Sequence, residues 1–304
     1  HTNTMSYTEI QERGKSKYYY RSLSKREGNK ISKIRRYLGK NLTNEELKRL
    51  EEEMDIGLGK PLQKVLSKKE IDSLETIKKN HKQSCKSNFD IKYEAFISRF
   101  TYDSNAIEGS TLTLKETAAI LFDNITPAGK SPREINEAIN HKKAFDFLIN
   151  YDEDINKEFI CQIQNIIVTN TLKKELESFT GIYRPLQVYI RGASFTPPKP
   201  EEVKKEMAAL IRWYDKNKKR LHPVIIAAYF HCAFESIHPF VDGNGRTGRL
   251  LIDFMLHKND FPMINIPVKR RLEYYDALET GRNGNLKKMI NLIISLMSTE
   301  ETSI

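Results

Sequence analysis

The chain has 304 residues, of which 39% are hydrophobic, and its net charge is +10. This is enough apolar material for one large domain with a small appendage. No apolar run approaches the roughly 20 residues that cross a bilayer, which excludes a membrane span and predicts a cytoplasmic protein. Cys85, Cys161 and Cys232 are far apart, so they exclude a disulfide framework and favour a reducing compartment. We expect residues 1–4 to be a remnant added ahead of Met5.

The positive charge is concentrated near the start of the chain. Residues 11–40 hold eleven Lys or Arg and two acids, a net +9, which leaves +1 for all other residues. Aromatic and β-branched residues at 17–24 and 31–38 flank Gly28-Asn29, a pattern that predicts a basic β-hairpin. Interleaved tyrosines and arginines suit a nucleic-acid surface, and the hairpin resembles those that open some transposase-like proteins. The alternative is a solvated ribbon that packs its tyrosines on the next helix.

Helices are predicted to connect this hairpin to the rest of the chain. Thr43-x-x-Glu46 and Ser67-x-x-Glu70 are capping boxes, in which the two side chains satisfy free backbone donors at a helix start. Each box therefore predicts a helix that begins there. The patterns divide the chain into a basic hairpin over 1–41, a helical connector over 42–88 and a mainly helical domain over 89–304.

Helical patterns dominate the last of these regions. Gly109 ends one helical run, and capping boxes at Thr113 and Ser131 open two more helices. The segment 187–196 is the exception. Its β-branched and aromatic residues surround a turn at Gly192, which predicts a small β-hairpin.

One stretch of the chain, His238-Pro-Phe-Val-Asp-Gly-Asn-Gly-Arg-Thr-Gly-Arg249, combines most of the residues that carry chemistry. Its glycines let backbone N–H groups approach an anion closely, and its arginines match phosphate oxygens in a fork. Asp242 suits a hard cation, and His238 can move a proton near neutral pH. Helical patterns lie on both sides, so a helix N-terminus adds free N–H groups and a positive dipole end.

Two common nucleotide-binding motifs are excluded for this stretch. Gly243-x-Gly245-x-x-Gly248 has the spacing of the dinucleotide fingerprint, but that fingerprint follows a strand, and here a helical pattern precedes it. No Gly-Lys-Ser/Thr follows the glycines, which excludes a Walker motif. The stretch therefore predicts a phosphate site of another kind.

The stretch matches the Fic family motif HPFx[D/E]GNGRxxR at every fixed position, and the chain resembles that family over roughly residues 90–300. The resemblance implies an all-α core with a small β-hairpin flap. It also implies transfer of AMP from ATP to a Tyr, Thr or Ser hydroxyl of a target protein, with Mg²⁺. His238 would be the general base and Asp242 the Mg²⁺ ligand. The implied phosphate-binding residues are Gly243, Asn244, Gly245, Arg246 and Arg249.

A second segment resembles the inhibitory motif of the same family, [S/T]xxxE[G/N]. It reads Ser104-x-x-x-Glu108-Gly109 and lies in a predicted helix near residues 101–109. In such family members the glutamate pairs with the last arginine of the main motif and holds ATP in an unproductive pose. The resemblance therefore implies that Glu108 restrains Arg249. The alternative is an ordinary glutamate at a helix end.

The resemblance further implies a flap over the active site at 187–196, where an extended segment of the target docks. The expected docking residues are Val188, Tyr189, Ile190 and Arg191. Tyr274 and Tyr275 match the family segment near the adenine, with core packing as the alternative. Self-modification and a homodimer remain open.

Two other functions remain as alternatives. One is a hydrolase that removes AMP from a protein with the same site. The other is a nucleic-acid-binding adaptor whose Fic core has become vestigial.

Overall fold

The computed structural model describes residues 4–14, 16–27, 30–47, 50–51, 62, 65–84, 89–193 and 195–299. The described chain is mainly helical, as predicted, and a three-stranded antiparallel sheet precedes the helices. The predicted boundary near residue 88, the Gly28-Asn29 turn and Cys85 lie outside the described residues. Among the described helices, none is long and apolar enough to cross a bilayer.

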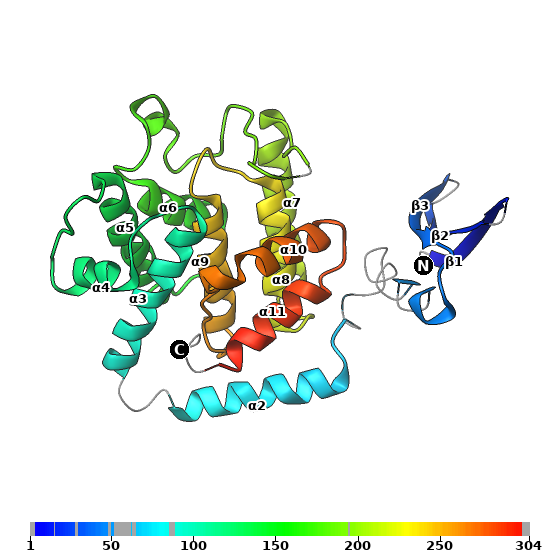
Figure 1. Ribbon diagram of the computed structural model, residues 1–304, viewed down its shortest axis with the longest axis horizontal. Coiled ribbons are helices and arrows are strands. Elements are labelled where there is room, and N and C mark those ends of the chain that lie inside the picture. The colour runs from blue at the N-terminus through cyan, green and yellow to red at the C-terminus, as the bar shows by residue number, and fades with distance from the viewer. Residues whose placement is uncertain are drawn as a thin grey trace.

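The sheet has the order β1-β2-β3, with β1 at Thr4–Arg13, β2 at Ser16–Glu27 and β3 at Lys30–Lys40. β2 and β3 are the two strands of the predicted basic hairpin. β1 was not predicted, because its mostly polar sequence has few of the apolar residues that indicate a strand. In Figure 1 the sheet lies apart from the main body of helices.

The helices follow in chain order. They are α2 at Lys68–Ser84, α3 at Phe89–Ile107, α4 at Leu114–Phe122, α5 at Pro132–Ile149, α6 at Lys157–Val168, α7 at Pro200–Asn217, α8 at Pro223–Ile237, α9 at Asn244–His257, α10 at Arg271–Arg282 and α11 at Lys287–Met297. Short 3₁₀ helices occupy Lys174–Phe179 and Val268–Arg270.

The core is built around α8 and α9, whose side chains are buried on nearly all sides. A helix that is apolar all round is stable in water only when other helices cover each face. α7, α10 and α11 pack on α8, while α3, α5 and α6 pack on α9 (Figure 1). The loop that joins α8 to α9, residues 238–243, is therefore held at both ends by the most buried helices.

The predicted helix starts are confirmed. Thr113 caps α4 and Ser131 caps α5, each with both reciprocal bonds of a capping box. Thr43 and Ser67 make the same exchange with the glutamate three residues later. In each case the side chains replace the intrahelical partners that the first turn lacks.

The predicted β-hairpin at 187–196 is wrong. In the described residues of this segment the backbone forms a turn without paired strands. One backbone hydrogen bond, from Ala193 N to Ile190 O, closes the turn at 3.1 Å. Strand propensity reflects packing on a neighbouring strand, and no strand of the described chain pairs with this segment.

Candidate active site

The loop between α8 and α9 has a fixed shape. His238 ends α8 with a left-handed backbone (φ 50°), and Gly243 begins α9 with another (φ 81°). The Asn244 side chain closes the loop, because its Oδ1 accepts from Phe240 N and its Nδ2 donates to Phe240 O, both at 2.9 Å. The side-chain amide of Asn244 is thus committed to the loop, and its backbone N–H is the part that belongs to an anion-binding turn.

The first turn of α9 has the features that could hold an anion. The N–H groups of Asn244, Gly245 and Arg246 have no carbonyl acceptor within the helix, and the positive end of its dipole lies there. Arg246 and Arg249 lie in the same helix, and each side chain is only 2% exposed. Two nearly buried guanidinium groups beside a helix N-terminus strongly favour a bound phosphate.

Arg249 is already paired with groups from α3. Its Nη2 donates to the Glu108 carboxylate at 2.8 Å and to the Ser104 carbonyl at 2.8 Å, and its Nε donates to Ser104 Oγ at 3.0 Å. Burial acts to lower the pKa of Arg249, but the charge and hydrogen bond of Glu108, together with Tyr274 and Glu235, outweigh it, so the pKa lies above its ordinary value. The structure therefore brings Ser104 and Glu108 of one motif to Arg249 of the other, which lies more than 140 positions later in the chain.

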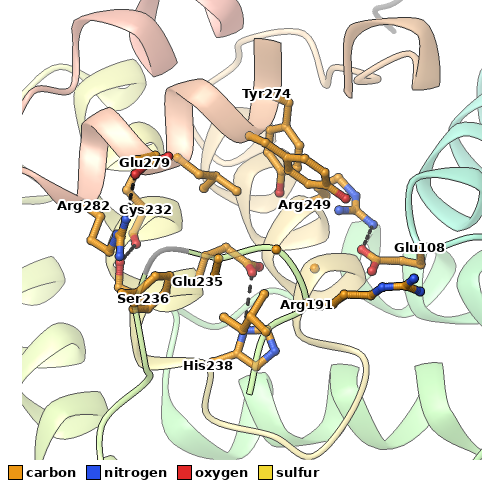
Figure 2. A pocket seen from close by; sticks show the side chains of 17 residues that line it. Glu108, Arg191, Cys232, Glu235, Ser236, His238, Arg249, Tyr274, Glu279 and Arg282 are labelled. Atoms are coloured by element: carbon orange, nitrogen blue, oxygen red, sulfur yellow. Dashed lines mark hydrogen bonds and ion pairs between the residues drawn. The ribbon is translucent and has the colours of Figure 1, made fainter. Parts of the chain in front are cut away.

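The Glu108 carboxylate lies directly over the start of α9. A methyl group added to Gly245 would collide with a Glu108 oxygen. The carboxylate thus occupies the space in which an anion would reach this turn. Figure 2 shows Glu108 and Arg249 side by side at one edge of a pocket that His238 also lines.

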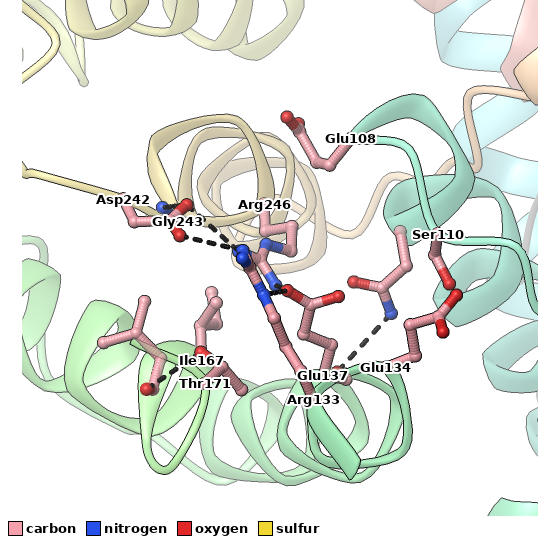
Figure 3. Close-up of polar contacts among 12 residues, drawn as sticks. Glu108, Ser110, Arg133, Glu134, Glu137, Ile167, Thr171, Asp242, Gly243 and Arg246 are labelled. Atoms are coloured by element: carbon pink, nitrogen blue, oxygen red, sulfur yellow. Dashed lines mark hydrogen bonds and ion pairs between the residues drawn. The ribbon is translucent and has the colours of Figure 1, made fainter. Parts of the chain in front are cut away.

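Asp242 and Arg246 belong to a second charged network, shown in Figure 3. Arg246 contacts Asp242 and Glu137, each at 3.3 Å, and Arg133 contacts the same two carboxylates at 3.2 Å and 2.9 Å. Arg133 and Glu137, both on α5, were missed by the sequence reading. They lie about a hundred residues before the loop, and no local pattern connects them to it.

Asp242 is the residue that could hold a metal ion. Within the described residues, no three His, Cys, Asp or Glu side chains converge on one point. Mg²⁺ is commonly held by one or two protein carboxylates, with phosphate oxygens and water completing its shell. The Asp242 side chain is 35% exposed, so it fits that role beside a phosphate-bearing ligand.

His238 is held as a neutral imidazole. Burial lowers its pKa to about 4, and the Glu235 backbone and nearby carboxylates offset only part of that shift. At neutral pH the ring is therefore free to accept a proton. Its own carbonyl accepts a hydrogen bond from Arg184 Nε at 2.8 Å, which fixes the backbone beneath the ring.

Arg184 joins the loop to the flap segment, although the sequence reading gave it no role. Its side chain is almost fully buried. It donates to the carbonyls of His238, Leu186 and Pro198, and its backbone N–H donates to Pro239 O at 2.8 Å. A buried guanidinium without a carboxylate partner is stable here because carbonyl oxygens satisfy its donors.

Of the residues predicted to contact the target or the adenine, some line the pocket and others do not. Ile190 and Arg191 line the pocket beside His238, together with Tyr274 and Tyr275. Tyr189 is 79% exposed, and neither it nor Val188 lines the pocket. Tyr274 is buried, and its hydroxyl is hydrogen-bonded to His231 Nε2 at 2.9 Å. Most of this side chain therefore packs in the core, as in the alternative prediction.

Glu235 is a further pocket residue that the sequence reading missed. It lies on α8 three residues before His238, its Oε2 is 3.8 Å from His238 Nδ1, and its side chain is only 13% exposed. Burial raises its pKa to about 8, and the nearby Glu108 charge adds to the effect. Glu235 is therefore mainly protonated at neutral pH.

Replacing Glu235 with glutamine is expected to stabilise the fold at high pH. Because the pKa of Glu235 is higher in the folded state, its contribution to the free energy of unfolding is fully present below the ordinary pKa of 4.5. That contribution is lost as the pH rises through about 8. The Tm of Glu235→Gln should match the unmodified chain near about pH 5 and exceed it by about 2 °C or more near about pH 9. Thermal unfolding at both pH values measures this. Glu279→Gln is the control, because Glu279 also lines the pocket but its side chain is 55% exposed. An equal difference in Tm between Glu235→Gln and the unmodified chain at both pH values would contradict the expectation.

Comparison with known proteins agrees with this geometry. The helical core and loop are those of a Fic domain, since a Bacteroides thetaiotaomicron Fic-domain protein superposes with a TM-score of 0.68 at 25% identity, covering 76% of this chain and 93% of that one. Caenorhabditis elegans Fic-1 (residues 134–508) gives 0.68 at 28% identity, covering 84% and 75%.

Sequence comparison leads to the same family. The family model described as Fic/DOC matches residues 154–256. "Protein adenylyltransferase Fic" of Nematostella vectensis is 36% identical over 63% of this chain, and "Protein adenylyltransferase fic-1" of Caenorhabditis elegans is 34% identical over 64%. The chain thus contains a region, residues 154–256, that is similar to the Fic/DOC family. The chain covers 45% and 38% of these two relatives, so it spans less than half of their length.

Proposed function

We propose that the chain is a protein adenylyltransferase that transfers AMP from ATP to a hydroxyl of a target protein, and that Glu108 restrains it. The observation that carries the proposal is the anion site at the start of α9, which shares one pocket with a neutral His238. Relatives named protein adenylyltransferase support the choice of reaction.

The proposed step is an in-line displacement at the α-phosphorus of ATP. A Tyr, Thr or Ser hydroxyl oxygen of the target forms a bond to that phosphorus, the bond to the bridging β-phosphate oxygen breaks, and pyrophosphate leaves. His238 takes the hydroxyl proton as general base. Burial keeps the imidazole unprotonated at neutral pH, so a ring nitrogen has a lone pair for this proton.

Positioning and charge neutralisation supply the rest of the catalysis. The phosphates are surrounded by the turn at Gly243, the N–H groups of Asn244, Gly245 and Arg246, and the Arg246 guanidinium, and Arg249 joins them once Glu108 has moved. Asp242 would hold Mg²⁺, which neutralises phosphate charge when it is bound. Arg184 keeps the His238 backbone in place beneath the reacting hydroxyl.

Glu108 is proposed to restrain this reaction by occupying both the anion space and Arg249. A triphosphate that enters the site meets a carboxylate over Gly245, and two negative groups in a partly buried site repel strongly. The Arg249 pair must also break before that guanidinium can bind phosphate. The target would dock along the flap residues, which include the pocket-lining Ile190 and Arg191.

The Glu108→Gly protein, incubated separately with ATP labelled at the α- or the γ-phosphate, tests the reaction. AMP transfer places the α label on protein and releases the γ label with pyrophosphate. We therefore expect protein-bound radioactivity from α-labelled ATP alone. Retention of the γ label would show phosphate transfer instead and overturn the proposal, as would the absence of both labels from a target-containing extract.

A further inference from the structure

We propose that the N-terminal sheet binds duplex DNA through the face that its helix leaves open, an activity separate from the nucleotide pocket. Two observations carry the proposal. The sheet has one covered face and one aromatic, basic face, and the strands belong to the part of the chain that holds nearly all of its net positive charge.

The covered face is marked by contacts with Glu51, which lies in the short helical segment after the sheet. Thr8 on β1 donates a hydrogen bond to Glu51, and Arg21 on β2 lies 3.5 Å from the same carboxylate. Tyr19 and Leu38 are buried, at 7% and 9% exposure. This side of the sheet is therefore the inside of the small N-terminal unit.

The opposite face carries tyrosines with cations above them, and we name it the tyrosine face. Cross-strand partners share a face, and Tyr37 is the partner of Tyr20 across β2 and β3. Tyr37 lies 5.3 Å from Tyr20 and 6.4 Å from Tyr18, measured between ring centroids, and it is 51% exposed. On this face Tyr37 is thus the solvent-exposed member of a cluster of three tyrosines.

Three cations lie over the rings of this cluster. Arg35 lies 3.9 Å from the Tyr20 ring centroid, while Arg13 and Lys40 lie 5.7 Å and 5.6 Å from the Tyr18 centroid. Glu9 is the acid of this face, and it forms an ion pair with Arg35 at 3.0 Å. The aromatic rings hold the cations in place with little loss of entropy on binding, which favours phosphate contacts.

The charge of the strands identifies the partner as a polyanion. Residues 11–40 carry a net +9, against +1 for the rest of the chain. A phosphodiester backbone presents regularly spaced negative charges, and its release of counterions on contact with Lys and Arg drives binding. An acidic protein lacks that regular charge, so nucleic acid is the better match.

The shape of the face favours a duplex over a single strand. Three strands at a spacing of roughly 4.8 Å span about 10 Å, close to the roughly 12 Å width of the DNA major groove. A single strand would instead need free ring faces on which its bases stack. Here the rings of Tyr18 and Tyr20 are already covered by Tyr37 and by cations.

Fluorescence anisotropy with the full chain and a labelled duplex of about 25 base pairs tests the proposal. We expect binding at about 50 mM salt that weakens steeply toward about 200 mM. Arg13→Glu combined with Lys40→Glu should weaken binding about tenfold or more and flatten the salt dependence. Lys205→Glu combined with Arg212→Glu, two exposed residues of α7, makes the same charge change far from the sheet and should have little effect.

Several outcomes would overturn the proposal. They are no binding at low salt, equal loss in the two double variants, and tighter binding of a single strand than of the duplex. The Tm of both double variants should be unchanged, which would show that weaker DNA binding comes from lost contacts and not from unfolding. Self-labelling by ATP in the Glu108→Gly background should be the same with and without the sheet substitutions, so this test is independent of the enzyme proposal.

Discussion

Glu108→Gly is expected to increase self-labelling with α-labelled ATP about tenfold or more over the unmodified chain, a change within the usual range of coupling between two sites. The substitution removes the carboxylate over Gly245 and releases Arg249 from its 2.8 Å ion pair. The proposed anion site then regains a guanidinium that no longer pairs with Glu108 and an open approach to the first turn of α9. Initial labelling rates at matched protein and ATP concentrations measure the effect.

Glu108→Gln is the matched control, because it keeps the side-chain volume and removes only the charge. If repulsion of phosphate is the main cause of restraint, this variant should show most of the increase. If occupied space is the main cause, it should remain close to the unmodified chain. Equal labelling of the unmodified chain and Glu108→Gly would contradict restraint altogether.

His238→Ala, introduced into the Glu108→Gly protein, is expected to lower the labelling rate by roughly 10²–10⁴-fold, the usual contribution of a general base. His238 ends α8 in the left-handed region, where alanine is strained. His238→Asn is therefore a second variant, since asparagine adopts this backbone readily and cannot serve as the base. Both variants should lose activity to a similar degree.

Binding of a fluorescent, non-hydrolysable ATP analogue provides the control for His238. Affinity should change little in either variant, because the phosphates are bound at the start of α9 and not by the imidazole. A labelling rate within about threefold of the parent would exclude His238 as the base by the size expected for such a group. Loss of nucleotide binding in the alanine variant alone would indicate backbone strain.

The sequence predicted best those features that are formed by residues close together in the chain. The loop from His238 to Arg249 is one continuous stretch, and the structure keeps its residues together at a helix junction. Capping boxes such as Thr113-x-x-Glu116 depend on residues three positions apart, so the predicted helix starts agree with the structure. The Glu108–Arg249 contact is long-range, yet the second motif pointed to it.

Other features could not be predicted because they depend on tertiary neighbours. Arg133 and Glu137 reach the loop only because α5 packs on α9. Glu235 looks like an ordinary helical glutamate until the packing of α9 on α8 helps to bury it, and burial raises its pKa. The segment 187–196 has the residues of a strand, but strand structure requires a partner, and the described fold offers none beside it.

The anchoring role of Arg184 has a consequence for how this scaffold can diversify. Its guanidinium donates hydrogen bonds to the carbonyls of Leu186, Pro198 and His238. Leu186 and Pro198 lie at the two ends of the segment that contains residues 187–196, so both ends of this segment are held at the same place as the His238 backbone. Under the proposed function, substitutions between Leu186 and Pro198 can therefore change which targets dock, while the backbone at His238 keeps its position.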